Sequence, residues 1–502
     1  MVDEFQDITV KEFKLIRRLS EENQNLFVVG DPDQNIYEWR GADMSVLVDF
    51  EGWLNNKCFE NQYGFTCRDI IMNENYRSTS PILSAANSLI EKNRNRVKKD
   101  LFTQKQGGQA VEYFHGKNDK EEIKYITDKI TAHVKDGGKY SDFAVLYRSN
   151  YVSRFVEQGF LTANIPYVVY GGVGFYERAE IKDVLSYMRL VSNPDDDLAF
   201  LRIINVPRRK IGKIKLDVLK NYAESNHVSL YKALTVCCLY DSFKGCKAGE
   251  FIAAIENLRA LADTLSVSEL LSRMMKDTGY ELYIRESGDI ERLDNISELI
   301  RGIVTQETEF GEHLTLAAFL QTVTLLRDSD APDKSDCVKI MTLHTSKGLE
   351  FGTVFLVGLT EGIFPSARSL EERKKEALEE ERRLCFVGIT RARNHLYLTE
   401  SEGFGVKGYS KVPSRFLFDI DQGLLHTVGE VPQDMRIQTA IQSKEFDGGN
   451  ERVYQKGDQL RHKVFGEGII EEVDEKTRTY YIRFTNGIKP ISFDYNGLSH
   501  VF

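Results

Sequence analysis

The chain has 502 residues, of which 41% are hydrophobic, 28% are charged and only 10 are proline, and this composition excludes fibrous and disordered proteins. Its net charge of −10 disfavours a protein that simply coats DNA, although an acidic body can carry a local basic track. The seven cysteines form no Cys-x-x-Cys pair and no zinc-spaced cluster, and no apolar stretch has the length of a membrane span. We therefore expect a soluble, cytoplasmic protein with reduced thiols.

The chain opens with paired carboxylates, because Asp3 and Glu4 directly follow the apolar Val2. At the carboxyl end of a buried parallel strand, one such carboxylate can hold hydrated Mg²⁺ and the other can orient an attacking water. On its own, an Asp-Glu pair is more often a solvated turn. A helix is predicted next, with one apolar face formed by Val10, Phe13, Ile16 and Leu19.

A second polar stretch follows a short strand predicted at 26–29. Gln34 stands where the carboxyl end of that strand meets a cleft. Beyond it, Tyr37 and Trp39 offer flat faces on which bases can stack, and Arg40 offers a charge for phosphate. The two stretches together predict a nucleotide site beside a nucleic-acid site.

The strings DEFQD at 3–7 and GDPDQNIYEWRGAD at 30–43 resemble motifs II and III of superfamily 1 DNA helicases of the UvrD, Rep and PcrA type. The resemblance implies that Asp3 and Glu4 are the catalytic and Mg²⁺-binding carboxylates for ATP, and that Gln34 senses the γ-phosphate. It also implies contacts to single-stranded DNA from Tyr37, Trp39 and Arg40.

The family's phosphate cradle is missing from the sequence, since no Gly-x4-Gly-Lys-Ser/Thr string occurs in it. In the family that P-loop precedes motif II, so we expect a fragment whose first lobe is incomplete and sticky. Positioning is most of phosphoryl-transfer chemistry, so we expect this chain not to hydrolyse ATP efficiently unaided. A complementing chain that carries the P-loop is an expected partner.

A second α/β unit begins at residue 67. Tyr76 and Arg77 precede a helix that Ser80 could cap, and the strand run at 143–147 ends in Arg148. The first site resembles motif IV, which implies that Tyr76 stacks on adenine and Arg77 reaches the γ-phosphate. The second resembles motif IVa and implies that Arg148 meets the DNA backbone. Packing plus surface charge is the plainer interpretation of each site.

From 175 to 335 the apolar spacing is helical. A basic loop at 205–214 carries Arg208 and Lys213, and a glycine turn between helices would offer amides and cations to phosphates. The loop resembles the helix-hairpin-helix of the family's inserted 2B subdomain, which implies DNA contacts from these residues. A solvated basic loop is an equal alternative.

The α/β pattern resumes at 338, where a strand leads into a polar, glycine-hinged loop. This loop resembles motif V, which implies that Thr342 and His344 bind DNA and that Glu350 faces the nucleotide. A lone histidine after a strand is more often structural. The helix predicted at 380–393 has acids first and arginines last, as the helix dipole prefers. It resembles motif VI, which implies that Arg391 is a second arginine finger.

After about residue 420 the composition loosens into a predicted linker, followed by short alternating strands that suit a small barrel. The strands resemble the Tudor-like tail of PcrA helicases, which contacts RNA polymerase. A small stabilising β domain without a partner is an equal alternative.

The expected fold class is α/β, with two RecA-like parallel-sheet lobes, a helical insertion and a small C-terminal β-barrel. The expected parts are a partial first lobe (1–66), a complete second lobe (67–174 and 336–420), the insertion (175–335), a linker (421–451) and the Tudor-like domain (452–502).

The resemblance implies an ATP-dependent 3'-to-5' helicase polypeptide of DNA repair and replication that acts on single strands and junctions. A non-catalytic adaptor that binds DNA and RNA polymerase is the alternative. A helicase subunit of a helicase-nuclease ranks last, because no nuclease domain fits after motif VI.

Overall fold

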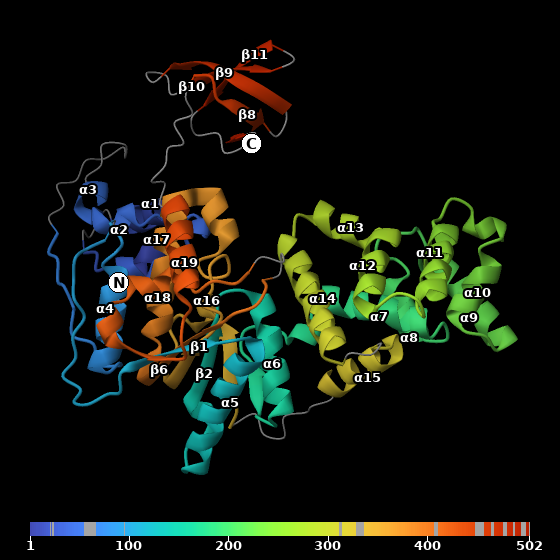
Figure 1. Ribbon diagram of the computed structural model, residues 1–502, viewed down its shortest axis with the longest axis horizontal. Coiled ribbons are helices and arrows are strands. Elements are labelled where there is room, and N and C mark those ends of the chain that lie inside the picture. Colours follow the sequence, from blue (N-terminus) through green and yellow to red (C-terminus); the bar gives the residue numbers. More distant parts are fainter. Residues whose placement is uncertain are drawn as a thin grey trace.

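The computed structural model describes residues 1–20, 22, 25–54, 67–94, 96–310, 314–327, 336–405, 410–446, 456–462, 466–474, 479–484, 487–492 and 498–500. A large parallel sheet lies beside a group of helices, and a small antiparallel sheet stands apart from both (Figure 1). In this part of the chain no helix is long and apolar enough to cross a membrane. The six cysteines among these residues are free, and Cys58 lies outside them.

The large sheet has seven strands in the order β3-β4-β2-β5-β6-β1-β7, and every neighbouring pair is parallel. The strands are β1 (Val111–Gly116), β2 (Phe143–Tyr147), β3 (Tyr167–Val169), β4 (Val338–Thr342), β5 (Phe351–Leu356), β6 (Ala392–Ser401) and β7 (Leu425–Val428). β2 is buried along its whole length, as expected for a central strand with both faces covered.

Two layers of helices cover the sheet because successive side chains of a strand point to opposite faces. Ala144 and Leu146 of β2 belong to one apolar cluster, and Val145 belongs to the other. The first cluster includes α4 (Ser80–Ile90), α16 (Leu343–Ser346), α17 (Ala367–Ile389) and α18 (Arg415–Asp419). The second includes α5 (Asp119–Lys135) and α6 (Ser153–Thr162).

Helices fill the chain between β3 and β4. They are α7 (Ala179–Ser192), α8 (Asp197–Ile203), α9 (Lys213–Asn226), α10 (Leu230–Cys237), α11 (Ala248–Leu261), α12 (Val267–Asp277), α13 (Tyr280–Ser287), α14 (Ile290–Phe310) and α15 (Leu316–Arg327). Their apolar faces share one cluster, in which Phe251, Ile255 and Leu258 of α11 are buried. We call residues 175–327 the helical insertion.

The N-terminal part contains α1 (Val10–Ser20), α2 (Ser45–Val48), α3 (Phe50–Leu54) and the 3-10 helices η1 (Phe5–Asp7), η2 (Pro32–Gln34) and η3 (Glu38–Arg40). Val2 and Val28 form an isolated parallel bridge, and Phe5, Phe13, Val46 and Leu54 form a small core. Leu19 was predicted on the buried stripe of α1 but is 74% exposed, because the helix packs through Phe13 instead.

The C-terminal sheet is antiparallel and has the order β11-β10-β9-β8-β12. Its strands are β8 (Gln459–His462), β9 (Gly466–Asp474), β10 (Thr479–Phe484), β11 (Gly487–Ser492) and β12 (Leu498–His500). Its core contains Leu460, Ile470, Tyr480, Ile482, Phe484 and Ile491. The Tudor-like barrel stays a prediction.

The structure differs from the sequence at the predicted linker, residues 421–451. β7 lies there and pairs in parallel with β1, and α19 (Gln433–Phe446) follows it. β7 has only four half-buried or exposed residues, so its apolar pattern is too weak to predict a strand. Its pairing with β1, more than three hundred residues earlier, comes from the fold.

Candidate functional site

Lys347, which directly follows α16, joins the N-terminal part of the chain to the large sheet. Its Nζ lies 3.3 Å from Glu4 Oε2, contacts the carboxylate of Asp7, and donates to the Gln34 carbonyl at 2.9 Å. The side chain is only 8% exposed. Burial raises the pKa of Asp7, although Lys347 opposes the shift. The sequence did not single out Lys347, and its only signal was a cation in the polar loop after β4.

The predicted catalytic groups of the N-terminal part meet through Gln6. The side-chain amide of Gln6 donates to Glu4 Oε2 at 2.5 Å and accepts from the Asp31 backbone amide at 2.9 Å. Gln34 Nε2 in turn donates to Asp31 at 2.8 Å. The structure thus brings Glu4 and Gln34 into one hydrogen-bonded network, with Asp3 beside Glu4.

The donor set suits a magnesium ion that a nucleotide brings with it. Asp3 and Glu4 are exposed, and a pair of carboxylates completed by phosphate oxygens and waters is how Mg²⁺ is usually held at such sites. Among the described residues no group of three or more His, Cys, Asp or Glu side chains could hold a metal ion by itself. Asp3 and Glu4 therefore fit a metal ion that binds together with the substrate.

Two arginines from the large-sheet unit, Arg77 and Arg393, meet at Glu350. Arg77 Nε lies 2.6 Å from one carboxylate oxygen of Glu350, and Arg393 contacts the other. Hydrogen bonds from Arg77 and Arg393 lower the pKa of Glu350 to about 2, so it is ionised at neutral pH. Arg77 also donates to the Thr390 carbonyl at 3.4 Å, which places it beside Arg391. Arg393 was not among the predicted residues.

Arg391 is buried and its guanidinium donates to neutral groups. It donates to the carbonyls of Val387 at 2.9 Å and Leu349 at 3.1 Å, and to the Thr390 hydroxyl at 3.2 Å. Burial, followed by the charge of Arg77, lowers the pKa of Arg391 to about 10, while Glu4 and Asp31 oppose the shift. Arg77 and Arg391 are neighbouring cations within reach of the charges of the N-terminal carboxylates, and they form a candidate anion site.

Tyr76 precedes this arginine cluster and is 74% exposed. Its hydroxyl donates to Glu74 at 2.9 Å, which orients the ring without covering it. An exposed aromatic ring next to an anion site suits stacking on a base. The predicted nucleotide-binding residues of the second unit, Tyr76, Arg77, Glu350 and Arg391, therefore lie together.

A second cluster, which we call the ring cluster, contains side chains from both units. It consists of Tyr37, Trp39 and Arg40 of the N-terminal part and His344 of α16. The His344 ring centroid lies 6.3 Å from that of Tyr37 and 6.4 Å from that of Trp39. The Arg40 guanidinium lies 4.6 Å from the Trp39 ring. Burial, helped by the charges of Arg148 and Arg40, lowers the pKa of His344 to about 4, so its imidazole is neutral at neutral pH.

Thr342 ends β4 and caps α16, where its Oγ1 accepts from the Thr345 amide at 3.2 Å. This cap turns the chain where His344 meets the rings of Tyr37 and Trp39. From the sequence alone a structural role is the more common one for such a histidine, and DNA binding by His344 stays a prediction. The structure places its ring against those of Tyr37 and Trp39, two other predicted DNA contacts.

Arg148 lies at the ring cluster, but its guanidinium is occupied. Its Nη2 lies 2.7 Å from Glu381 Oε1, and its Nε lies 3.0 Å from both oxygens of that carboxylate. Glu381 belongs to α17 and was not among the predicted residues. The pair could not be predicted from the sequence, because its members are 233 positions apart in the chain.

Two further predicted DNA contacts, Arg208 and Lys213, are exposed in the helical insertion. Between them Arg209 points inward, and its Nη1 donates to the Ile203 carbonyl at 2.8 Å. Its guanidinium lies 4.6 Å from the Phe251 ring. The basic loop therefore offers fewer cations to solvent than its sequence suggests.

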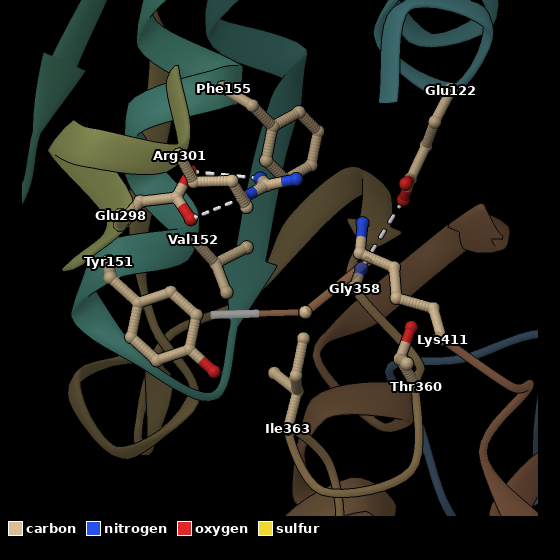
Figure 2. Close-up of a pocket in the computed structure, with 11 residues that line it drawn as sticks. Glu122, Tyr151, Val152, Phe155, Glu298, Arg301, Gly358, Thr360, Ile363 and Lys411 are labelled. Carbon is tan, nitrogen blue, oxygen red and sulfur yellow. Dashed lines mark hydrogen bonds and ion pairs between the residues drawn. The ribbon is translucent and has the colours of Figure 1, made fainter. Parts of the chain in front are cut away.

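A cavity of about 20 Å³, the size of one water, lies elsewhere, where α14 meets the large-sheet unit (Figure 2). On one side Glu298 and Arg301 of α14 form an ion pair, and on the other Glu122 accepts from the Gly358 amide at 3.3 Å. Arg301 also binds Asp119 at 2.7 Å. The charged groups that line this cavity already have ion-pair or hydrogen-bond partners, and the space is small. We therefore interpret it as part of the interface between α14 and the large-sheet unit rather than as a ligand site.

Comparisons with known proteins match almost the whole chain. The family described as the UvrD-like helicase C-terminal domain matches residues 70–403, and the UvrD/REP helicase N-terminal domain matches residues 1–54. The ATP-dependent DNA helicase PcrA of Bacillus subtilis is 38% identical over 499 residues, covering 94% of this chain. The PcrA helicase of Staphylococcus epidermidis is 36% identical over 497 residues, covering 95% of this chain.

The chain spans 66% of the length of these relatives. A solved structure of the C-terminal domain of a possible DNA helicase from Lactobacillus plantarum covers 70% of this chain at 9% identity. Its TM-score of 0.28 is too low to support an argument about fold.

Proposed function

The chain belongs to the UvrD-like helicase family, and from this premise we propose that it is an ATP-dependent 3'-to-5' DNA helicase polypeptide of DNA repair and replication. The observation that carries the proposal is the position of Arg391. Its buried charge has only neutral hydrogen-bond partners among the described residues, and it lies beside Arg77 and within reach of the charge of Glu4 across the boundary between two units. A triphosphate suits that boundary because its charge would pair with Arg391, which has no acidic partner among the described residues, and would also attract the neighbouring Arg77.

In the proposed mechanism each side chain has one task. Glu4 orients the attacking water, Gln34 senses the γ-phosphate, and Arg77 and Arg391 stabilise charge on the transferring phosphoryl group. Tyr76 stacks on adenine, and Glu350 holds Arg77 in place. Asp3 and Glu4 would hold Mg²⁺, which neutralises phosphate charge when bound.

Translocation would follow from the same boundary. ATP would draw the two units together and hydrolysis would release them, so that the grip on DNA alternates. Lys347 supports this coupling because it touches Glu4 and the Gln34 carbonyl from the end of α16, the helix that carries His344. Single-stranded DNA would lie on the ring cluster, and Arg208 and Lys213 would contact duplex phosphates.

ATP hydrolysis tests the proposal, with and without single-stranded DNA, for the chain and for Glu4→Gln. Because the 502 residues contain no Gly-x4-Gly-Lys-Ser/Thr string, we expect weak turnover by the chain itself. Adding a polypeptide that carries such a loop should produce DNA-stimulated turnover that Glu4→Gln abolishes. Turnover that survives Glu4→Gln would refute the assigned role of Glu4.

The second candidate function is a non-catalytic adaptor, and one outer face of the C-terminal sheet favours it. Ile469 of β9 and Ile488 of β11 pair with Arg483 of β10 in one row across the sheet, and they are 45% and 49% exposed. An exposed apolar row around a cation suits a protein partner.

We propose RNA polymerase as the partner of this face. Binding of purified polymerase that is independent of ATP and lost in Ile469→Asp would favour the adaptor function. Equal binding by the chain and the variant would rule out this face.

A further inference from the structure

The long helix α17 carries two adjacent carboxylates that reach different units of the molecule. Glu380 Oε1 accepts from the Glu38 backbone amide at 3.1 Å, at the start of the 3-10 helix that carries Trp39 and Arg40. Glu381 binds Arg148, which follows β2 of the large sheet. The same helix ends at Ile389, two residues before Arg391. One rigid element therefore connects both halves of the ring cluster to the anion site.

A second contact strengthens the link to the N-terminal part. Arg383 of α17 is buried, donates from Nε to the Asn35 carbonyl at 2.8 Å, and contacts the carboxylate of Glu38. Any shift of α17 relative to the large sheet would therefore move the segment around Trp39 with it.

The pair between Arg148 and Glu381 uses the Nε–Nη2 edge of the guanidinium, and Nη2 also donates to the Ser369 hydroxyl at 3.4 Å. The two side chains are only 19% and 5% exposed. Glu381 Oε2 also accepts from the Ser366 amide at 3.1 Å, which fixes the carboxylate in place. Phosphate and carboxylate bind the same fork of an arginine, so a bound Glu381 excludes a DNA phosphate from the Nε–Nη2 edge of Arg148.

Arg148 is close enough to the DNA face for this competition to matter. Tyr147, the residue before it, pairs with Thr342 of β4, two residues before His344. The charge of Arg148 reaches His344, where it contributes to the lowered pKa of the imidazole. The side chain thus stands beside the ring cluster while its donors point at α17.

We propose that Glu381 is a positioning residue that competes with DNA phosphate for Arg148, and that Arg148 grips the strand only when α17 releases it. The inference rests on the proposed function, because it assumes that DNA lies on the ring cluster. In the conformation described here, the DNA grip consists of the ring cluster without Arg148. Because α17 ends two residues before Arg391, a change at the nucleotide site can move this helix. Its movement adds or removes the contact between Arg148 and one DNA phosphate.

The test is the salt dependence of oligo-dT binding without nucleotide, for the chain and five variants. Each phosphate contact to single-stranded DNA adds about 0.7 to the slope of log affinity against log salt. Glu381→Gln frees Arg148 and should steepen the slope by about 0.7 and tighten binding at low salt. Glu376→Gln, an exposed change of the same charge on the same helix, should leave the slope unchanged.

Arg148→Gln provides an independent test, because glutamine removes the charge but still has an amide that can donate to Glu381. In the otherwise unaltered chain it should leave the slope unchanged, because Arg148 is not yet on the DNA. Combined with Glu381→Gln, it should return the steepened slope to that of the parent chain. A purely structural role for Glu381 would lower thermal stability in both Glu381 variants without this reversal.

Two results would overturn the inference. One is a Glu381→Gln slope equal to that of Glu376→Gln, and the other is a slope flattened by about 0.7 in Arg148→Gln alone. Trp39→Ala separates this failure from failure of the proposed function. If Trp39→Ala leaves oligo-dT binding intact, the DNA site itself is wrong; if it weakens binding while Glu381→Gln changes nothing, only the competition is wrong.

Discussion

At the scale of single residues, Lys347 decides how the N-terminal part meets the large sheet. It offers one buried ammonium to two carboxylates and a carbonyl, and one oxygen of Asp7, Oδ1, has no hydrogen-bond partner among the described residues. Loss of the cation would leave Asp7 buried and unpaired. Such a group costs more free energy than a lost surface ion pair.

Lys347→Met should therefore lower the free energy of unfolding by about 3 kcal/mol. The substitution keeps the length of the side chain and removes only its charge and hydrogen bonds. Chemical denaturation measures the change. Lys11→Met, at an exposed position of α1, is the matched control and should stay within about 0.5 kcal/mol of the parent chain. Equal stability of the two variants would show that the contacts of Lys347 with Glu4, Asp7 and Gln34 do not stabilise the fold.

His115 of β1 is a second residue whose role is set by its neighbours. Its Nδ1 lies 2.5 Å from Glu400 Oε1, and its Nε2 lies 3.1 Å from Glu402 Oε1. The Tyr113 hydroxyl also donates to Glu400, at 2.7 Å. Burial lowers the pKa of His115, but the hydrogen bonds and charges of the two glutamates offset this and raise it above 6.5.

A raised folded-state pKa means that protonated His115 stabilises the fold. That stabilisation is complete below the usual pKa of 6.5 and is lost as the pH rises through the folded-state pKa. His115→Gln should therefore cost about 1–2 kcal/mol more at about pH 6 than at about pH 8.5. Thermal melts of both proteins at the two pH values measure this difference. A cost that does not change with pH would show that His115 stays neutral.

At the scale of elements, the loop between α8 and α9 shows that adjacent cations can have opposite roles. Arg208 is exposed, whereas the guanidinium of Arg209 donates to the carbonyls of Ile203 and Ile204 and to the Tyr187 hydroxyl. Arg209 thus closes the end of α8 and ties it to α7. Of these two arginines, only Arg208 is available to a phosphate.

Substitution of these two neighbours should separate stability from binding. Arg209→Ala leaves buried carbonyls without donors and should destabilise the helical insertion by about 3 kcal/mol. Arg208→Ala should change stability by less than about 0.5 kcal/mol and flatten the salt slope for duplex DNA by about 0.9. Calorimetry and binding titrations measure the two effects. An unchanged slope in Arg208→Ala would favour the solvated loop over the DNA contact.

At the scale of the whole molecule, the apolar clusters follow the units seen in Figure 1. The cluster of the C-terminal sheet contains only residues of that sheet, whereas α18 shares the core of the large sheet. A unit with its own core folds with little help from the rest of the chain.

Truncation after Phe446 should therefore leave the main thermal transition within about 2 °C of that of the full chain. The shortened chain should also keep its affinity for single-stranded DNA, because the ring cluster lies before residue 446. Calorimetry and oligo-dT titration test both points. A transition lowered by much more would show that the C-terminal sheet stabilises the rest of the molecule.

The sequence by itself determined the family, the parallel α/β sheet with an inserted helical region, and the residue types of both candidate sites. It could do so because each motif is local: an apolar strand followed by a polar loop predicts its own structure and its own chemistry. The grouping of Tyr76, Arg77, Glu350 and Arg391 follows the predicted motifs, and so do the contacts of Tyr37 and Trp39 with His344.

The tertiary structure alone decided which charged groups are free. Arg148 and Arg208 look alike in sequence, yet Glu381 occupies the first while the second faces solvent. Lys347 bridges to Asp7 across 340 residues, and β7 joins the sheet from a segment that reads as a linker. In each case the outcome depends on a partner distant in the chain, because hydrogen bonds and ion pairs act through space and local spacing carries no record of them.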